Sequence, residues 1–178
     1  MAETITQLIS EERIQQRVEE LAAQISKDYE GREVRLVGIL KGASFFMCDL
    51  AKRITVPVSI DFMQASSYGG KTESSGTVMI RKDLDEAIDG LDVIIVEDIV
   101  DSGRTLQFLG EFLKNKGARS IRYCTLLDKP DRRVTDVEVD YCGFTIPDEF
   151  VVGYGLDYAQ RYRNLPFVGV LSFENTEE

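Results

Sequence analysis

The 178-residue chain contains no histidine and no tryptophan, and it has only three cysteines and four prolines. Without histidine, neither a Ser-His or Cys-His catalytic pair nor a metal site with an imidazole ligand can form. The cysteines Cys48, Cys124 and Cys142 are far apart, and each lies in an apolar context. We therefore interpret them as small core residues rather than metal ligands or disulfide partners.

Long apolar runs are also missing, because no stretch approaches the roughly 20 residues that a transmembrane helix needs. The first residues, Met1 to Thr4, lack the basic start and apolar core of a signal peptide. With 43% apolar and 29% charged residues, the composition is typical of one globular domain with a real core. We expect a cytoplasmic protein whose single domain covers residues 1–178.

Basic residues are fewer than acidic ones, and the net charge is −10. This balance disfavours nucleic acid as the default partner. An acidic protein that binds a phosphorylated substrate needs local lysines and arginines, or a metal ion, to attract that substrate.

Residues 93–106 combine the features of a ligand site. Val93 to Val96 are β-branched and apolar, which predicts a strand buried on both faces. Glu97 and Asp98 follow at its carboxyl end, and Asp101 lies in the turn. In an open parallel sheet, ligands bind beyond the carboxyl ends of the strands. Carboxylates at this place suit sugar hydroxyls or Mg²⁺.

The turn after these acids is made of small residues and opens a helical pattern. It comprises Ser102, Gly103, Arg104, Thr105 and Leu106. Such a turn directs backbone N–H groups and the positive end of a helix dipole toward an anion. The sequence therefore predicts a phosphate site beside a group of acids.

The order acid, acid, two apolar residues, Asp, Ser, Gly, any residue, Thr resembles the phosphoribosyl-pyrophosphate motif of the type I phosphoribosyltransferases. With Glu97 first and Asp101 fifth, the motif is most similar to that of the hypoxanthine-guanine branch. The resemblance covers nearly the whole chain. It implies an α/β fold with a mainly parallel sheet flanked by helices, a flexible hairpin loop, and a small hood built largely from residues 129–166.

Apolar spacing predicts the elements of that fold. Ser10 can cap a first helix that ends at Gly31, and further helices start at Ser44 and near Leu106. The expected strands cover residues 34–39, 56–64, 77–81, 93–96, 120–127, 137–144 and 168–171.

The resemblance assigns roles to residues outside the central motif. Lys41 and Gly42 match the pyrophosphate loop, although the same residues also suit an ordinary turn between a strand and a helix. Ser67 and Tyr68 match the Ser-Tyr pair of the flexible catalytic loop, in a stretch to residue 76 that also fits a plain hairpin tip.

Later residues would read the base and the leaving group. By resemblance, Lys129 meets the 6-oxo group of the purine, Phe150 stacks on the ring, and the backbone of Val151 reads the base edge. Asp157 matches a second metal-binding aspartate, and Arg163 matches the arginine that meets pyrophosphate. From the residues alone, Lys129 could be a solvated cation and Phe150 a core residue.

The implied reaction joins a 6-oxopurine to phosphoribosyl pyrophosphate, giving a nucleoside monophosphate and pyrophosphate. Mg²⁺ is the implied cofactor, with Glu97, Asp98 and Asp157 as its candidate ligands. Glu97 and Asp98 would hold the ribose hydroxyls directly or through Mg²⁺, and residues 101–106 would hold the 5′-phosphate. Asp101 is the candidate general base for the N7 proton. A homo-oligomer, dimer or tetramer, is expected, with no nucleic acid and no membrane as partners.

Three alternatives remain open. A response-regulator receiver has a similar acidic pocket, but there the acid pair lies on the first strand. A pyrimidine-operon regulator shares the expected fold and binds RNA, but its motif usually lacks an acid at the place of Asp101. A transferase that prefers xanthine or adenine stays possible because the 6-oxo assignment depends on Lys129 alone.

Overall fold

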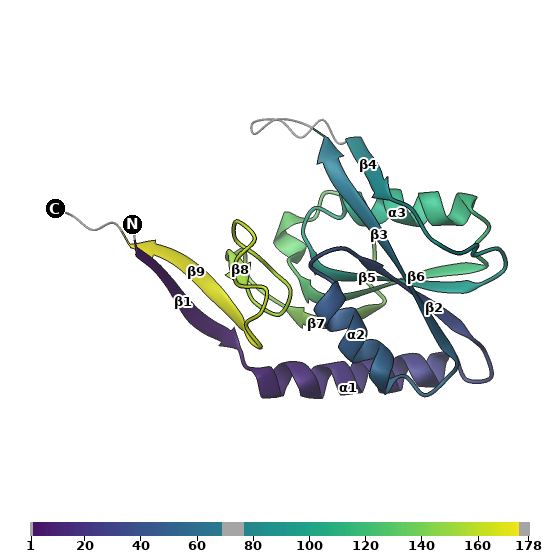
Figure 1. The fold of residues 1–178 in the computed structure, drawn as a ribbon, viewed down its shortest axis with the longest axis horizontal. Helices are drawn as coiled ribbons and strands as arrows, with labels where there is room; N and C mark the ends of the chain where they lie inside the picture. The colour runs from purple at the N-terminus through teal and green to yellow at the C-terminus, as the bar shows by residue number, and fades with distance from the viewer. Residues whose placement is uncertain (1, 69–76, 175–178) are drawn as a thin grey trace.

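A computed structural model of the protein describes residues 2–68 and 77–174. Its main feature is a six-stranded sheet with the order β4-β3-β2-β5-β6-β7 (Figure 1). The strands are β2 (Val34–Ile39), β3 (Val58–Tyr68), β4 (Thr77–Lys82), β5 (Asp92–Val100), β6 (Ser120–Asp128) and β7 (Tyr141–Thr145). All neighbouring pairs are parallel except β3 and β4, which form an antiparallel hairpin. The expected fold class is confirmed.

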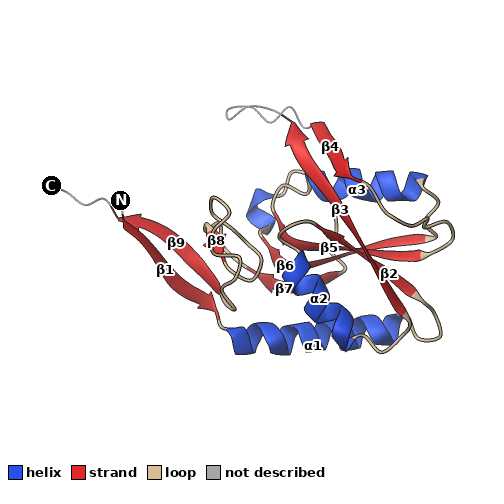
Figure 2. Ribbon diagram, viewed as in Figure 1, coloured by secondary structure: helices blue, strands red, loops and turns tan. Residues whose placement is uncertain are grey.

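Helices cover both faces of this sheet because the buried strands alternate their side chains between two cores (Figure 2). The helices are α1 (Glu11–Asp28), α2 (Ser44–Arg53), α3 (Arg104–Asn115) and the short 3-10 helix η1 (Pro130–Arg132). On one face, Ile94 and Val96 of β5 pack in the same core as residues of α1 and α2. On the other face, Val93 and Ile95 pack in the core that contains the apolar side of α3.

A second, three-stranded sheet has the order β1-β9-β8. It consists of β1 (Ala2–Ile9), β8 (Val151–Val152) and β9 (Val168–Glu174). In Figure 1 the long β1–β9 pair extends away from the main sheet, and Ala2 pairs with Glu174 at its far end. Only β8 of this sheet lies within the range 129–166 that was expected to form a hood, since β1 and β9 come from the two ends of the chain.

Several element boundaries differ from the sequence-based expectation. The predicted cap of α1 is confirmed, because Ser10 Oγ accepts a hydrogen bond from the Arg13 N–H at 3.2 Å. The helix ends earlier than expected, at a C-cap on Tyr29. The strand expected over residues 137–144 begins only at Tyr141, because pairing with β6 starts there. Residues 69–76, where most of the expected flexible loop falls, lie outside the described residues.

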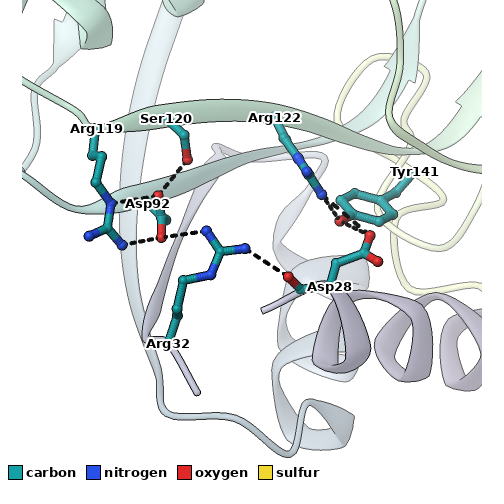
Figure 3. Close-up of polar contacts among 7 residues, drawn as sticks. All are labelled: Asp28, Arg32, Asp92, Arg119, Ser120, Arg122 and Tyr141. Atoms are coloured by element: carbon teal, nitrogen blue, oxygen red, sulfur yellow. Dashed lines mark hydrogen bonds and ion pairs between the residues drawn. The ribbon is translucent and has the colours of Figure 1, made fainter. Parts of the chain in front are cut away.

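The amino end of β5 carries a buried carboxylate, Asp92, that ties three segments together (Figure 3). Its Oδ1 accepts hydrogen bonds from Ser120 Oγ at 2.6 Å and from Arg119 Nε at 3.1 Å, and Arg32 Nη1 lies 3.4 Å from Oδ2. These donors, with Arg119 contributing most, lower the pKa of Asp92 to about 2. The cluster fixes the end of β5 that lies opposite the acids Glu97 and Asp98.

Within the described residues, no helix is both long enough and apolar enough to cross a membrane.

Candidate active site

The parallel strands of the main sheet end at one edge, and a candidate residue follows the end of each of three neighbouring strands. Lys41 follows β2, Asp101 follows β5 and Lys129 follows β6. This arrangement is the one in which α/β proteins place their ligand sites. From the sequence we expected the strand to end at Val96 with the two acids after it. Strand β5 instead runs on to Val100, so Glu97 and Asp98 lie within its last residues.

A cavity of about 280 Å³ opens at this edge. Its walls bring together two of the three acids and most of the turn predicted from the central motif. The lining residues are Ile39, Ala65, Glu97, Ile99, Val100, Asp101, Ser102, Gly103, Thr105 and Leu106. Glu97 and Asp101 thus line one cavity with Ser102, Gly103, Thr105 and Leu106, whereas Asp98 and Arg104 do not line it. That all of these residues act in one site stays a prediction.

The turn after β5 has the geometry of an anion-binding helix start. Gly103 is the N-cap of α3 and has a φ of +83°, a conformation that side chains with a Cβ rarely adopt. An added Cβ would also lie 2.3 Å from Thr135 Oγ1. The helix then begins at Arg104, whose N–H donates to Ser102 Oγ at 3.3 Å. The positive end of the α3 dipole is therefore directed at the cavity wall that Gly103, Thr105 and Leu106 form.

The acid pair Glu97 and Asp98 is electrostatically strained. Burial, followed by the neighbouring charge of Asp98, raises the pKa of Glu97 well above its ordinary value. Burial likewise raises the pKa of Asp98 to about 6, although the Ile99 N–H that donates to its carboxylate at 2.7 Å and the charge of Arg163 act in the opposite direction. A cation or a set of hydroxyl donors bound here would relieve this repulsion.

The loop after β2 approaches the acid pair so closely that it needs a glycine. A Cβ added to Gly42 would lie 1.8 Å from Asp98 Oδ2. Gly155 approaches from the other side, where an added Cβ would lie 2.1 Å from the Gly42 carbonyl oxygen. The peptide bond between Leu40 and Lys41 is cis. The close approach at Gly42 puts this part of the loop backbone directly against the carboxylate of Asp98.

Two cations converge on one amide oxygen beside this loop. Lys41 Nζ donates to Gln160 Oε1 at 3.2 Å, and Arg163 Nη2 lies 3.4 Å from the same oxygen. Asp157 holds the group together, because its Oδ1 is 3.1 Å from Arg163 Nη2 and its Oδ2 accepts the Gln160 N–H at 2.8 Å. Arg163 Nη1 also donates to the Gly155 carbonyl at 2.6 Å. The arrangement suits an anionic ligand close to Asp98.

Lys129 is nearly buried, with 10% of its side chain exposed. Its N–H donates to the Val100 carbonyl at 3.0 Å, which fixes the lysine backbone beside the end of β5. Its Nζ lies 3.6 Å from Asp148 Oδ1. The alternative of a solvated loop cation is therefore wrong for Lys129.

Phe150 is half-exposed, so the alternative of a core residue is wrong as well. Its ring meets that of Tyr158 edge-on, with 5.8 Å between centroids and an angle of 90°. Val151, the next residue, is buried and pairs with Val170 in β8 and β9. An exposed aromatic face beside a fixed backbone can accept a planar ring by stacking.

Ser67 lines a second cavity of about 400 Å³ that shares Asp101, Ser102 and Thr105 with the first. Arg104 and Arg132 also lie on its wall. Tyr68 is the last residue of β3, and its side chain lies outside the described part of the chain.

Asp157 does not join Glu97 and Asp98 in a three-carboxylate cluster. Within residues 2–68 and 77–174, no group of three or more acidic or cysteine side chains is close enough to hold a metal ion. The charge of Asp157 nevertheless contributes to the raised pKa of Asp98, so the two carboxylates interact.

Sequence reasoning missed Gln160, Arg132 and Asp148. Gln160 lies between two predicted site residues in the sequence, which was a usable signal. Arg132 and Asp148 had none, because single charged residues in polar stretches give no pattern before their partners are known.

Comparison with known proteins agrees with this geometry. Residues 4–159 match the family described as phosphoribosyl transferase domain. The hypoxanthine-guanine phosphoribosyltransferase of Bacillus subtilis is 54% identical over 92% of this chain and 91% of its own. A crystal structure of a hypoxanthine-guanine phosphoribosyltransferase from Bacillus anthracis has 47% identity and a TM-score of 0.91, covering 97% of this chain and 100% of that one.

The chain therefore belongs to the phosphoribosyl transferase family, and the receiver alternative is wrong. Its named relatives over the full length are of the hypoxanthine-guanine branch, which confirms the branch indicated by the motif. The chain is also 53% identical to the bifunctional protein TilS/HprT of Listeria monocytogenes, of which it spans 26%.

Proposed function

We propose that the protein transfers the 5-phosphoribosyl group of phosphoribosyl pyrophosphate to hypoxanthine or guanine, giving IMP or GMP and pyrophosphate in purine salvage. The observation that carries this proposal is the single cavity in which Glu97, Asp101 and the start of α3 meet. The names of the full-length relatives support the same reaction.

The sugar phosphate would be held by the turn and the acid pair. Residues 101–106 supply backbone N–H groups and hydroxyls for the 5′-phosphate at the positive end of α3. The oxygens of Glu97 and Asp98 accept hydrogen bonds from ribose hydroxyls. Because burial raises the pKa of both acids, donors bound to them replace the hydrogen bonds to water that burial removes.

The leaving pyrophosphate would occupy the neighbouring group of cations. Lys41 and Arg163 already direct N–H donors to one oxygen atom, that of Gln160. The close approach of Gly42 to Asp98 lets the loop backbone lie against the ligand as well. Positive charge placed where negative charge develops stabilises the transition state of bond cleavage.

The residues present fit Mg²⁺. This ion takes oxygen ligands and commonly uses only one or two carboxylates, with water and substrate phosphates completing its shell. Glu97 and Asp98 supply such oxygens in a buried place where the charge of Asp98 raises the pKa of Glu97 and that of Asp157 raises the pKa of Asp98, so a cation would favour their ionised forms. We propose Glu97, Asp98 and Asp157 as its ligands, directly or through ribose and water. When bound, the ion supplies positive charge that stabilises the leaving pyrophosphate.

Asp101 is the proposed general base. It is the first residue after β5, it lines both cavities, and half of its side chain is exposed. A carboxylate at this place can accept the N7 proton of the purine as the new bond to the sugar forms.

Base recognition would rest on Lys129, Phe150 and Val151. An ammonium donates hydrogen bonds and accepts none, so Lys129 pairs with a 6-oxo group but not with the 6-amino group of adenine. An unmatched buried polar group costs about 1–3 kcal/mol, and more if charged. Adenine should therefore be a very poor substrate. Xanthine is not excluded by Lys129, because its 2-oxo group would face the backbone near Val151.

The test compares kcat/KM for hypoxanthine, guanine, xanthine and adenine with phosphoribosyl pyrophosphate and Mg²⁺. We expect hypoxanthine to exceed adenine by up to about 10⁴-fold. Lys129→Ala should lower kcat/KM for hypoxanthine and guanine, so that these values come closer to the kcat/KM for adenine. Equal use of adenine and hypoxanthine by the wild type would refute the role of Lys129.

The remaining proposals concern the setting of the enzyme. We propose a homo-oligomer in the cytoplasm whose partners are the two substrates, with neither nucleic acid nor a membrane involved. The acidic composition supports this setting, since a net charge of −10 disfavours binding to nucleic acid.

A further inference from the structure

The ammonium of Lys129 depends on one acid for its place. Lysine is seldom buried unless its charge is paired, and Lys129 Nζ lies 3.6 Å from Asp148 Oδ1. The lysine backbone is fixed independently, because its N–H donates to Val100 and its carbonyl accepts the Arg132 N–H at 3.1 Å. The position of the backbone is therefore set by β5 and η1, while the direction of the amino group depends on Asp148.

Asp148 also reaches the general base through a second ion pair. Its Oδ2 accepts a hydrogen bond from Arg132 Nη1 at 3.3 Å. Arg132 Nε in turn lies 3.6 Å from Asp101 Oδ1. The charges alternate in the order Lys129, Asp148, Arg132, Asp101, so each ion has an opposite neighbour.

Asp148 joins the two segments that build the base pocket. It lies two residues before Phe150, whereas Lys129 lies at the end of β6. The Ile146 N–H donates to the Asp128 carbonyl at 2.9 Å, which brings the backbones of these segments together. The contact between Asp148 and Lys129 then fixes the amino group relative to the stacking ring.

We propose that Asp148 is a positioning residue for base specificity, because its carboxylate holds the Lys129 ammonium where it meets the purine's 6-oxo group. This inference rests on the proposed function. Without the carboxylate, the ammonium has no fixed direction. The hydrogen bond that separates 6-oxopurines from adenine is then weakened.

The test measures kcat and KM for hypoxanthine, adenine and phosphoribosyl pyrophosphate in Asp148→Asn and in a control, Glu149→Gln. Glu149 is exposed, and its replacement by Gln removes one charge from the same segment. Asp148→Asn should raise the KM for hypoxanthine by about tenfold, with little change in the KM for phosphoribosyl pyrophosphate, because ground-state binding of the base is what is lost. The ratio of kcat/KM for hypoxanthine to kcat/KM for adenine should fall in Asp148→Asn, and Asp148→Glu should restore part of that ratio.

A double-mutant cycle separates positioning from a general structural effect. In the Lys129→Ala background, Asp148→Asn should not narrow the preference further, because the group it positions is gone. The inference would be overturned if Asp148→Asn lowered kcat/KM equally for hypoxanthine and adenine, or raised the KM values for hypoxanthine and phosphoribosyl pyrophosphate equally. Asp148→Ser carries the same test if the Asn variant does not fold.

The two proposals fail in different ways. If the wild type shows no preference for hypoxanthine over adenine, the proposed function of the Lys129 site is wrong. If the wild type has that preference and Asp148→Asn keeps it unchanged, only the role of Asp148 is wrong.

Discussion

Asp98→Asn should make the ligand-free protein more stable at pH 8 although it weakens substrate binding. Burial raises the pKa of Asp98 from its usual 3.8 to about 6. At about 1.4 kcal/mol for each pH unit, this interval means that ionised Asp98 destabilises the fold by up to about 3 kcal/mol. The folded chain binds the proton more tightly than the unfolded chain, so the penalty is complete above pH 6. It shrinks as the pH falls toward 3.8 and is absent below that value.

Asparagine keeps the shape of the side chain and an oxygen that can accept the Ile99 N–H. It also removes the charge that contributes to the raised pKa of Glu97. The gain in stability should therefore appear without a change in fold, and it should be largest where both acids are ionised. Binding of the sugar phosphate should weaken, because the ribose hydroxyls and the cation lose one negative partner.

The assay is urea unfolding of the wild type and Asp98→Asn at pH 8 and near pH 4, without ligands. The difference in the free energy of unfolding should reach up to about 3 kcal/mol at pH 8 and become small near pH 4. Asp131→Asn, at an exposed acid, is the matched control and should change neither value. Equal or lower stability of Asp98→Asn at pH 8 would show that burial does not destabilise this carboxylate.

Other variants test the remaining parts of the structure. Asp92→Asn should lower the free energy of unfolding at pH 7 by at least about 2 kcal/mol, because Arg119 lowers the pKa of Asp92 to about 2. In the wild type, the stability that ionised Asp92 contributes is complete above pH 3.8 and is lost as the pH falls through 2, which urea unfolding at a series of pH values measures. Gly42→Ala should lower kcat/KM by about 10²-fold, because its Cβ would displace the Asp98 carboxylate; unchanged kinetics would contradict the close approach. Asp101→Asn should lower kcat by about 10²–10⁴-fold with little change in the KM for phosphoribosyl pyrophosphate. A raised KM with an unchanged kcat would instead assign Asp101 to substrate binding. Exhaustive chelation of divalent cations should abolish turnover, measured as pyrophosphate release, and full activity after chelation would exclude a metal requirement.

The central site was predictable because its parts are adjacent in the sequence. A buried strand, two acids and a small-residue turn before a helix define their own geometry, which is why Glu97, Asp101 and most of the turn line one cavity, although Asp98 and Arg104 do not. Lys41 and Lys129 could also be placed, since each follows the end of a strand in the same parallel sheet.

The rest depends on contacts between distant segments. Neither β1 nor β8 was predicted, because each is defined by its pairing with β9 rather than by its own pattern. Val137 and Val139 have the alternation of a strand, but they pack beside the core under α3 while the ladder with β6 begins only at Tyr141. Local propensity could not reveal which apolar residues would find a hydrogen-bonding partner.

The pairing of β1 with β9 has a consequence for the order in which the enzyme assembles. Ala2 pairs with Glu174 and Ile9 with Val168, so β1 has its pairing partner only after β9 has been synthesised. Glu3 of β1 also accepts hydrogen bonds from Arg161 and Tyr162, in the turn that leads to Arg163. During synthesis the six-stranded sheet can form first, whereas the leaving-group side of the site is completed only when residues 168–174 have emerged. Contacts of such long sequence separation form late in folding, so in a ribosome-bound chain stalled before β9 we expect the turn proposed for the sugar phosphate to be complete and the side proposed for pyrophosphate to be incomplete.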